Sequence, residues 1–402
     1  MAPKIYSAQT PADLAALTDE QSGLLAQLDT QELKSSASRW SNRHLIAYRL
    51  LTSPETTVLE AFKTDHENQC PVCRPGESGC LQKLNPDKTK AITEKDNPHD
   101  FTRVTECELM ELPDGFFWIA LARTCRTELL DEVRVQPQRE RKPVEKEGFV
   151  NSSTAIDGPS SPVVSSGSEF EDSIVSADNL GEDEHEELRS KPEDATVNLI
   201  SCFLRYALSG CLLQDRKGRR EVQPRTDRLK AKARISGVKD IAAEDDGGIC
   251  VAQRRLNGWG TQHPYLALVE AKRAFKYIHF DDQTGKSKPI VSNETLAQYL
   301  GEAVITWKAN RNLLAQDVFL IAATNVYVRF VHFRFGSDYE QYVDATNVEV
   351  QRALVDDPAR DTCVHMQATK WFNLASARGR RGALCHVLAL LRWHQAHGVL
   401  VD

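Results

Sequence analysis

The sequence lacks the features that mark secreted or membrane-spanning proteins. It has no apolar run approaching the roughly 18 residues that a membrane helix requires, and its first residues, MAPKIYSAQTPADL, do not pair a basic start with an apolar core. No fixed-period repeat is evident. We therefore expect an intracellular protein, nuclear or cytoplasmic and not a membrane protein, whose ten cysteines are reduced thiols rather than a disulfide framework.

The charge of the chain is distributed unevenly. The net charge is −7, but residues 151–200 contain twelve acids and two bases, whereas residues 215–234 contain nine bases and three acids. A cluster of cations can bind phosphates without sequence preference, and a solvated loop and strand face is the alternative interpretation. The candidates for binding nucleic acid are Arg216, Lys217, Arg219, Arg220, Arg228 and Lys230.

Composition divides the chain into three segments. Residues 1–136 show helical spacing of apolar residues at first and then two apolar runs, 107–112 and 116–121, around Pro113-Asp114-Gly115, which predicts a hairpin. Residues 137–192 are rich in Ser and acids and poor in large apolar residues, so we expect a disordered linker. Residues 193–402 form the predicted second domain.

The N-terminal segment contains a candidate metal site. His66, Cys70, Cys73 and Cys80 include a Cys-x2-Cys knuckle, a spacing typical of structural zinc sites, in a loop-rich stretch that a metal would make rigid. His66, His99 and Cys107 are alternatives for the fourth ligand. Unbound thiols are the competing interpretation.

The pattern of the last 210 residues predicts an α/β sandwich. Helices are expected at 197–208, from Ser292 or Asn293 onward, and at the C-terminus, where apolar residues repeat from Leu384. Short apolar or alternating segments between them predict strands near 211–214, 229–243, 249–253, 264–271, 317–323 and 326–333.

One of these strands ends in an acid and a base. Leu266 to Val269 are apolar, and Glu270 and Lys272 follow on one face, because side chains alternate along a strand. A buried carboxylate and ammonium cost several kcal/mol unless each has a partner, and a divalent cation would supply one. We predict Asp240 as the second carboxylate on an adjacent strand. Asp245 and Asp246 compete for this role, but they lie in an expected turn.

These motifs resemble the PD-(D/E)XK nuclease superfamily, in particular the nuclease-like domains of predicted fungal proteins. The resemblance covers the C-terminal half and depends on Ser236-Gly237-x-x-Asp240, Val269-Glu270-Ala271-Lys272 and the helix with Gln298-Tyr299-Leu300. It implies a restriction-endonuclease-like mixed sheet flanked by helices, with a smaller N-terminal α+β region. It also implies that Asp240 and Glu270 bind Mg²⁺ or Mn²⁺, that Lys272 is catalytic, that Gln298 is auxiliary and that Glu193 is the acid of the first helix.

Together these observations predict a metal-dependent nuclease that hydrolyses phosphodiester bonds of nucleic acid. The alternative is a catalytically inactive module of the same fold that binds nucleic acid or a protein partner. A scaffolding role is a third hypothesis. Trp259 is predicted either to stack on a base or to fill the core from a loop.

Overall fold

A computed structural model of the chain describes most residues outside the central segment. The described residues are 5–18, 23–74, 82–94, 103–126, 193–214, 218–272, 277–281 and 286–400. The predicted linker, 137–192, lies outside them. Among the described helices, none is both long enough and apolar enough to cross a membrane.

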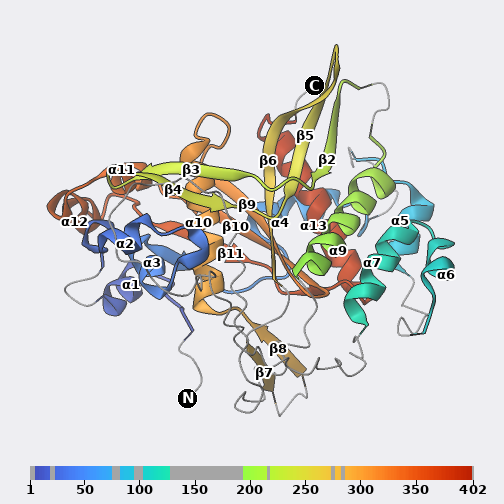
Figure 1. Ribbon diagram of the computed structural model, residues 1–402, viewed down its shortest axis with the longest axis horizontal. Coiled ribbons are helices and arrows are strands. Elements are labelled where there is room, and N and C mark those ends of the chain that lie inside the picture. Colours follow the sequence, from blue (N-terminus) through green and yellow to red (C-terminus); the bar gives the residue numbers. More distant parts are fainter. Residues whose placement is uncertain are drawn as a thin grey trace, which may run out of the picture. The chain divides into compact units, whose positions relative to one another are not determined.

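The main sheet has eight strands (Figure 1). It is mixed, as the sequence analysis predicted. β1 pairs with β11 and β6 pairs with β9 in parallel, and the other neighbours are antiparallel. In spatial order the strands are β1 (Leu50–Thr52), β11 (Val364–Ala368), β10 (Tyr327–Phe335), β9 (Asp317–Thr324), β6 (Gly258–Lys272), β5 (Gly248–Arg255) and β2 (Arg220–Arg225), with β12 (Phe372–Asn373) beside β10.

Two further strand pairs stand outside this sheet. β3 (Lys230–Ile235) and β4 (Val238–Glu244) form one antiparallel pair, and β7 (Tyr277–Asp281) and β8 (Lys286–Ile290) form the other. The predicted strand near 211–214 is wrong, since the only pairing found there among the described residues is an isolated bridge between Leu84 and Leu212. β2, which follows that segment, is the real edge strand of the sheet.

The main sheet is covered on both faces, which explains why its central strands are nearly continuous apolar runs. Along β9, Val318, Leu320 and Ala322 pack into one core, and Phe319 and Ile321 pack into the other. The first core contains α10 (Asn293–Ala309), and the second contains α9 (Glu193–Arg205) and α13 (Ala377–Ala396). In Figure 1, α10 and α13 accordingly lie on opposite sides of β9 and β6.

The N-terminal residues do not form a separate small domain. They divide between the two cores, and the described residues up to Arg126 and from Glu193 onward form one compact unit. The first core receives β1 with α1 (Pro11–Leu17), α2 (Thr30–Lys34) and α3 (Asn42–Ala47). The second receives α4 (Glu60–Gln69), α5 (Pro86–Thr93), α6 (Glu106–Met110) and α7 (Gly115–Cys125). The predicted boundary at residue 136 therefore does not separate two cores.

The predicted hairpin over 107–121 is also wrong, because both runs are helices, α6 and α7. Thr105 caps α6 in a reciprocal capping box with Glu108, a signal that the hairpin prediction did not weigh. Asp114 adopts a left-handed conformation, φ 57°, between the two helices. Phe117, Leu121 and neighbouring residues then bury one helical face in the second core.

Several predicted elements are confirmed. α9 spans the expected first helix and continues into a π-helical turn, Tyr206–Cys211. Ser292 caps α10 by accepting a hydrogen bond from the Thr295 amide. β9 and β10 meet at a tight turn where Asn325 has a positive φ of 52°. The chain continues through α11 (Tyr339–Asp344) and α12 (Val348–Asp356) to the long final helix α13.

Candidate active site and thiol cluster

The end of β6 presents the predicted acid and base to the α10 side of the sheet. Leu268 packs into the core that contains α10, so Glu270 and Lys272, two and four residues later, face the same way. The Lys272 Nζ lies 2.6 Å from Glu270 Oε1. The Glu270 side chain is only 2% exposed, whereas that of Lys272 is 25% exposed. The pair therefore lies at the border between the core and solvent.

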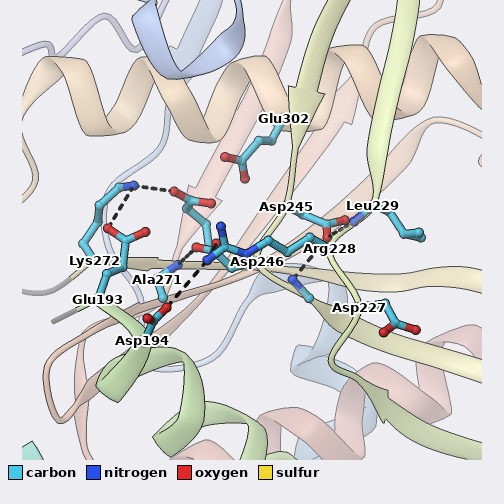
Figure 2. Close-up of polar contacts among 12 residues, drawn as sticks. Glu193, Asp194, Asp227, Arg228, Leu229, Asp245, Asp246, Ala271, Lys272 and Glu302 are labelled. Atoms are coloured by element: carbon cyan, nitrogen blue, oxygen red, sulfur yellow. Dashed lines mark hydrogen bonds and ion pairs between the residues drawn. The ribbon is translucent and has the colours of Figure 1, made fainter. Parts of the chain in front are cut away.

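The register of β5 brings Asp246 to Glu270. Gly248 lies opposite Leu268, and this antiparallel register, extended by two residues, sets Asp246 opposite Glu270. The Asp246 amide donates to the Val269 carbonyl at 2.9 Å, and the Ala271 amide donates to Asp246 Oδ2 at 3.0 Å. Two backbone contacts thus hold the Asp246 carboxylate beside the Glu270 strand (Figure 2).

Helix α10 adds two polar side chains one turn apart. Gln298 Nε2 donates to Glu270 Oε1 and also to Glu302 Oε1, the latter at 3.0 Å. Glu302 is 1% exposed and its carboxyl lies beside that of Glu270, but its Oε2 has no hydrogen-bond donor among the described residues. Sequence reasoning identified Gln298 and missed Glu302. The signal was a polar residue four positions after Gln298 within an otherwise apolar helix face.

The first turn of α9 approaches from the opposite side. Glu193 Oε2 lies 3.9 Å from Lys272 Nζ, so the predicted helix acid does reach the site. Arg228 bridges the rim, with its Nη2 3.1 Å from Asp246 Oδ1 and 3.9 Å from Asp194 Oδ1. We call the group Glu193, Asp246, Glu270, Lys272, Gln298 and Glu302 the acidic site. Figure 2 shows Glu193, Asp246 and Glu302 reaching this site from three different elements.

Crowding of buried acids changes their ionisation. Burial raises the pKa of Glu270 to about 7, with Lys272 opposing the shift and Asp246 adding to it. Burial, together with the Glu270 carboxyl beside it, raises the pKa of Glu302 well above the usual range. Burial also raises the pKa of Glu193. Burial lowers the pKa of Lys272, but the neighbouring carboxylates outweigh this and leave it raised. A second positive charge would relieve the repulsion among these acids.

The prediction of Asp240 as the second carboxylate requires correction. Asp240 is exposed on β4, has a positive φ of 62°, and lies where the β3–β4 register shifts. The error came from the choice of neighbouring strand, since β4 pairs with β3, and β6 pairs with β5 and β9. Asp245, the other alternative, is occupied by the buried Arg225, whose guanidinium reaches it at 2.8 and 2.7 Å.

The predicted phosphate-binding residues are dispersed. Arg228 lies at the rim of the acidic site, and Lys230 begins β3 on its exposed face. Arg219 and Arg220 lie at the start of the edge strand β2. Arg216 and Lys217 lie outside the described residues. Trp259 is 53% exposed at the tip of the β5–β6 hairpin, so it does not fill the core.

A second group of side chains unites α4 with α13. His66, Cys70, Cys73 and Cys385 place their ligand atoms within 4.8 Å of one another, and we call them the thiol cluster. The Cys385 sulfur is 3.6 Å from the sulfurs of Cys70 and Cys73, and Cys73 Sγ is 3.7 Å from His66 Nε2. The Cys70–Cys73 turn is closed by the Arg74 amide, which donates to the Cys70 carbonyl at 2.9 Å.

Three of the four residues in this cluster were predicted. Cys80 and His99 lie outside the described residues, and Cys107 is exposed and is not part of the cluster. Cys385 takes the fourth position. Its local sequence carries no metal signal, because it is a single cysteine on the apolar face of α13, and only the packing of α13 on α4 brings it to the knuckle.

The chain matches no family model and no curated protein. Its function therefore has to be inferred from the geometry of its own residues.

Proposed function

We propose that the protein is a divalent-metal-dependent nuclease whose acidic site hydrolyses phosphodiester bonds of nucleic acid. The supporting observation is the convergence of Asp246, Glu270 and Lys272, two carboxylates and an amine, at the ends of two paired strands. This arrangement, on a mixed sheet with helices on both faces, favours the restriction-endonuclease-like fold that the sequence resembles. Metal-assisted hydrolysis needs carboxylates that bind the metal ion and a positively charged side chain near the phosphate. Asp246 and Glu270 would be the carboxylates, and Lys272 would be the charged side chain.

The acidic site fits a hard divalent cation such as Mg²⁺ or Mn²⁺. Mg²⁺ prefers oxygen ligands and is commonly bound through one or two carboxylates, which Asp246 and Glu270 would supply. The pKa of Glu270 is raised even though Lys272 pairs with it, and Oε2 of the buried Glu302 has no hydrogen-bond donor among the described residues. Such groups are costly to bury without a partner, so the site suits an added positive charge.

The chain's own residues have separable tasks. Asp246 and Glu270 would hold the cation, which when bound polarises a phosphate oxygen and favours deprotonation of water. Lys272 Nζ carries the positive charge that can stabilise a developing phosphate charge and orient a water molecule. Gln298 fixes the Glu270 carboxylate by donating to its Oε1. Glu193 reaches Lys272 from α9 and keeps the ammonium at the open side of the site.

The direct test is cleavage of single- and double-stranded DNA and RNA with and without Mg²⁺. We expect Glu270→Gln to reduce cleavage by about 100-fold or more, because it removes a ligand charge from the site. Glu349→Gln, which changes an exposed glutamate on α12, is the matched control and should leave the rate unchanged. Circular dichroism would verify that both variants are folded.

Each outcome of this test discriminates between functions. Cleavage that persists at the wild-type rate in Glu270→Gln would remove Glu270 from the mechanism. Binding of nucleic acid without cleavage of any substrate would favour the inactive binding module.

We further propose that the thiol cluster holds a structural zinc ion. A tetrahedral site with Zn–S bonds of about 2.3 Å separates two sulfurs by about 3.8 Å and a sulfur from a nitrogen by about 3.6 Å. The separations of 3.6, 3.6 and 3.7 Å lie close to these values. A disulfide would require about 2.05 Å, so the sulfurs are not covalently paired. The Cys385 and Cys73 thiols beside it lower the pKa of Cys70, which favours a thiolate at this position.

A further inference from the structure

Strand β3 separates cations from apolar residues with a strict period of two. Ala231, Ala233 and Ile235 are buried in the core that contains α10, whereas Lys230, Lys232 and Arg234 are exposed. The buried alanines and isoleucine fix the orientation of the strand, because a shift of one residue would place the charges in the core. The three cations therefore lie in one line on the outer face.

This line leads to the acidic site. Arg228, two residues before Lys230, continues the spacing and is 3.1 Å from Asp246. We call Arg228, Lys230, Lys232 and Arg234 the β3 cation row. Alternate residues of a strand are about 6.6 Å apart, so the row spans about 20 Å from the rim of the acidic site. Figure 2 shows Arg228 and Leu229 at the point where the chain leaves the site for β3.

The outer cations of the row are not neutralised by ion pairs. Lys230, Lys232 and Arg234 form no ion pair with any residue that the structure describes. Neighbouring β4 places Glu244 opposite Lys230 and Ala242 opposite Lys232, and exposes Asp240 near Arg234. The row is thus a single line of positive charge with acids along its β4 side.

We propose that the β3 cation row binds the phosphate backbone of a single nucleic-acid strand and guides it to the acidic site. This inference rests on the proposed nuclease function and names its substrate class. A straight row one residue wide can follow one backbone, and its lysines act as point charges that do not read bases. A second, complementary backbone on the β4 side would meet Asp240 and Glu244, which repel it.

The test measures binding rather than cleavage. A fluorescent single-stranded oligonucleotide is titrated in EDTA over a series of salt concentrations, and log affinity is plotted against log salt. Each phosphate contact adds about 0.7 to this slope for single strands. We therefore expect the triple variant Lys230→Gln, Lys232→Gln, Arg234→Gln to reduce the slope by about 2. Lys232→Gln alone should reduce it by about 0.7 if the triple variant does not fold.

A matched control removes the same charge elsewhere. Lys83→Gln, Lys370→Gln and Arg378→Gln change three exposed cations outside β3 that form no ion pair with the described residues, and they should leave the slope unchanged. Equal losses in both triple variants would mean that only total charge matters and would overturn the proposal. An unchanged slope in the β3 variant would also overturn the proposal. A reduction of the slope seen only with duplex DNA, where three phosphate contacts contribute about 2.7 to the slope, would overturn it as well.

This test can fail independently of the proposed chemistry. If Glu270→Gln keeps full cleavage while the β3 variant loses its salt dependence, the β3 cation row stands and the assignment of Glu270 fails. If Glu270→Gln abolishes cleavage and the β3 variant binds normally, the nuclease stands and its substrate reaches the site by another surface.

Discussion

The acidic site and the thiol cluster both collect side chains from distant parts of the sequence, but their donors and coordination differ. The acidic site offers carboxylate oxygens beside an amine, with Lys272 and Glu193 partly exposed. The thiol cluster offers three sulfurs and one imidazole, which are enough to complete a tetrahedron. A metal site with oxygen ligands and access to solvent can bind and activate a substrate. A site with all four protein ligands in place is typical of a metal that stabilises the fold. The difference predicts that one site controls activity and the other controls stability.

Helix α13 connects these two regions. Cys385 lies in the thiol cluster, and Nε2 of His394, farther along the same helix, donates a hydrogen bond to the Leu266 carbonyl at 2.8 Å. Leu266 belongs to β6, the strand that ends in Glu270 and Lys272. One helix therefore contacts both regions. Substitutions at different positions of α13 can perturb the thiol cluster or the β6 strand separately.

The largest effect is expected from breaking the thiol cluster. Cys385→Ser should release about one equivalent of zinc and lower the free energy of unfolding by about 3–5 kcal/mol, because metal binding is coupled to folding. Metal analysis and denaturant unfolding measure the two effects. Cys250→Ser, which changes an equally buried cysteine on β5, should cost about 1–3 kcal/mol with no change in zinc. Equal metal content in both variants would contradict the distinction between the two regions.

A smaller effect is expected from protonating His394. Burial lowers the pKa of His394 to about 4, so the folded state binds its proton less readily than the unfolded chain. The neutral His394 contributes about 3 kcal/mol to the free energy of unfolding above about pH 6.5. This contribution is lost as the pH falls toward 4. His394→Gln should therefore weaken the loss of stability between these pH values, measured by denaturant unfolding. An unchanged pH profile would show that His394 does not hold α13 to β6 in this way.

The smallest effect is expected from Gln298→Ala, which tests the positioning of Glu270. Loss of the hydrogen bonds from Gln298 should reduce cleavage by about tenfold and lower the free energy of unfolding by about 1–3 kcal/mol, because two buried carboxylates lose a donor. It should also move the acidic limb of the pH–rate profile to higher pH, since a hydrogen bond to a carboxylate favours its charged form. A slower rate with an unmoved acidic limb would indicate a structural role alone.

What the sequence predicted was local, and what it missed was set by distant packing. The strand ending in Glu270 and Lys272 was visible because apolar residues and a period of two lie within seven residues. Asp246 was weighed and passed over, because strand adjacency is not encoded locally and the Asp245–Gly248 stretch looked like a remote turn. Cys385 had no local signal, since α4 brings its partners from the other end of the chain.

The prediction of a separate N-terminal domain missed distant packing in the same way. Residues 5–126 supply apolar faces to both cores, but the acidic composition between 151 and 200 suggested a boundary between independent units. The helices over 106–125 were missed because a proline and glycine between two apolar runs resembled a hairpin turn. The capping box of Thr105 and Glu108 is the local signal that would have favoured a helix.

The most direct measurement compares Asp246→Asn with Asp240→Asn in Mg²⁺-dependent cleavage. Both substitutions remove one carboxylate charge from the same region of sequence, but only Asp246 lies opposite Glu270. We predict that Asp246→Asn lowers the cleavage rate by about 100-fold or more, with partial recovery at higher metal concentration, and that Asp240→Asn cleaves at the wild-type rate. Loss of cleavage in Asp240→Asn with retention in Asp246→Asn would contradict the acidic site as described.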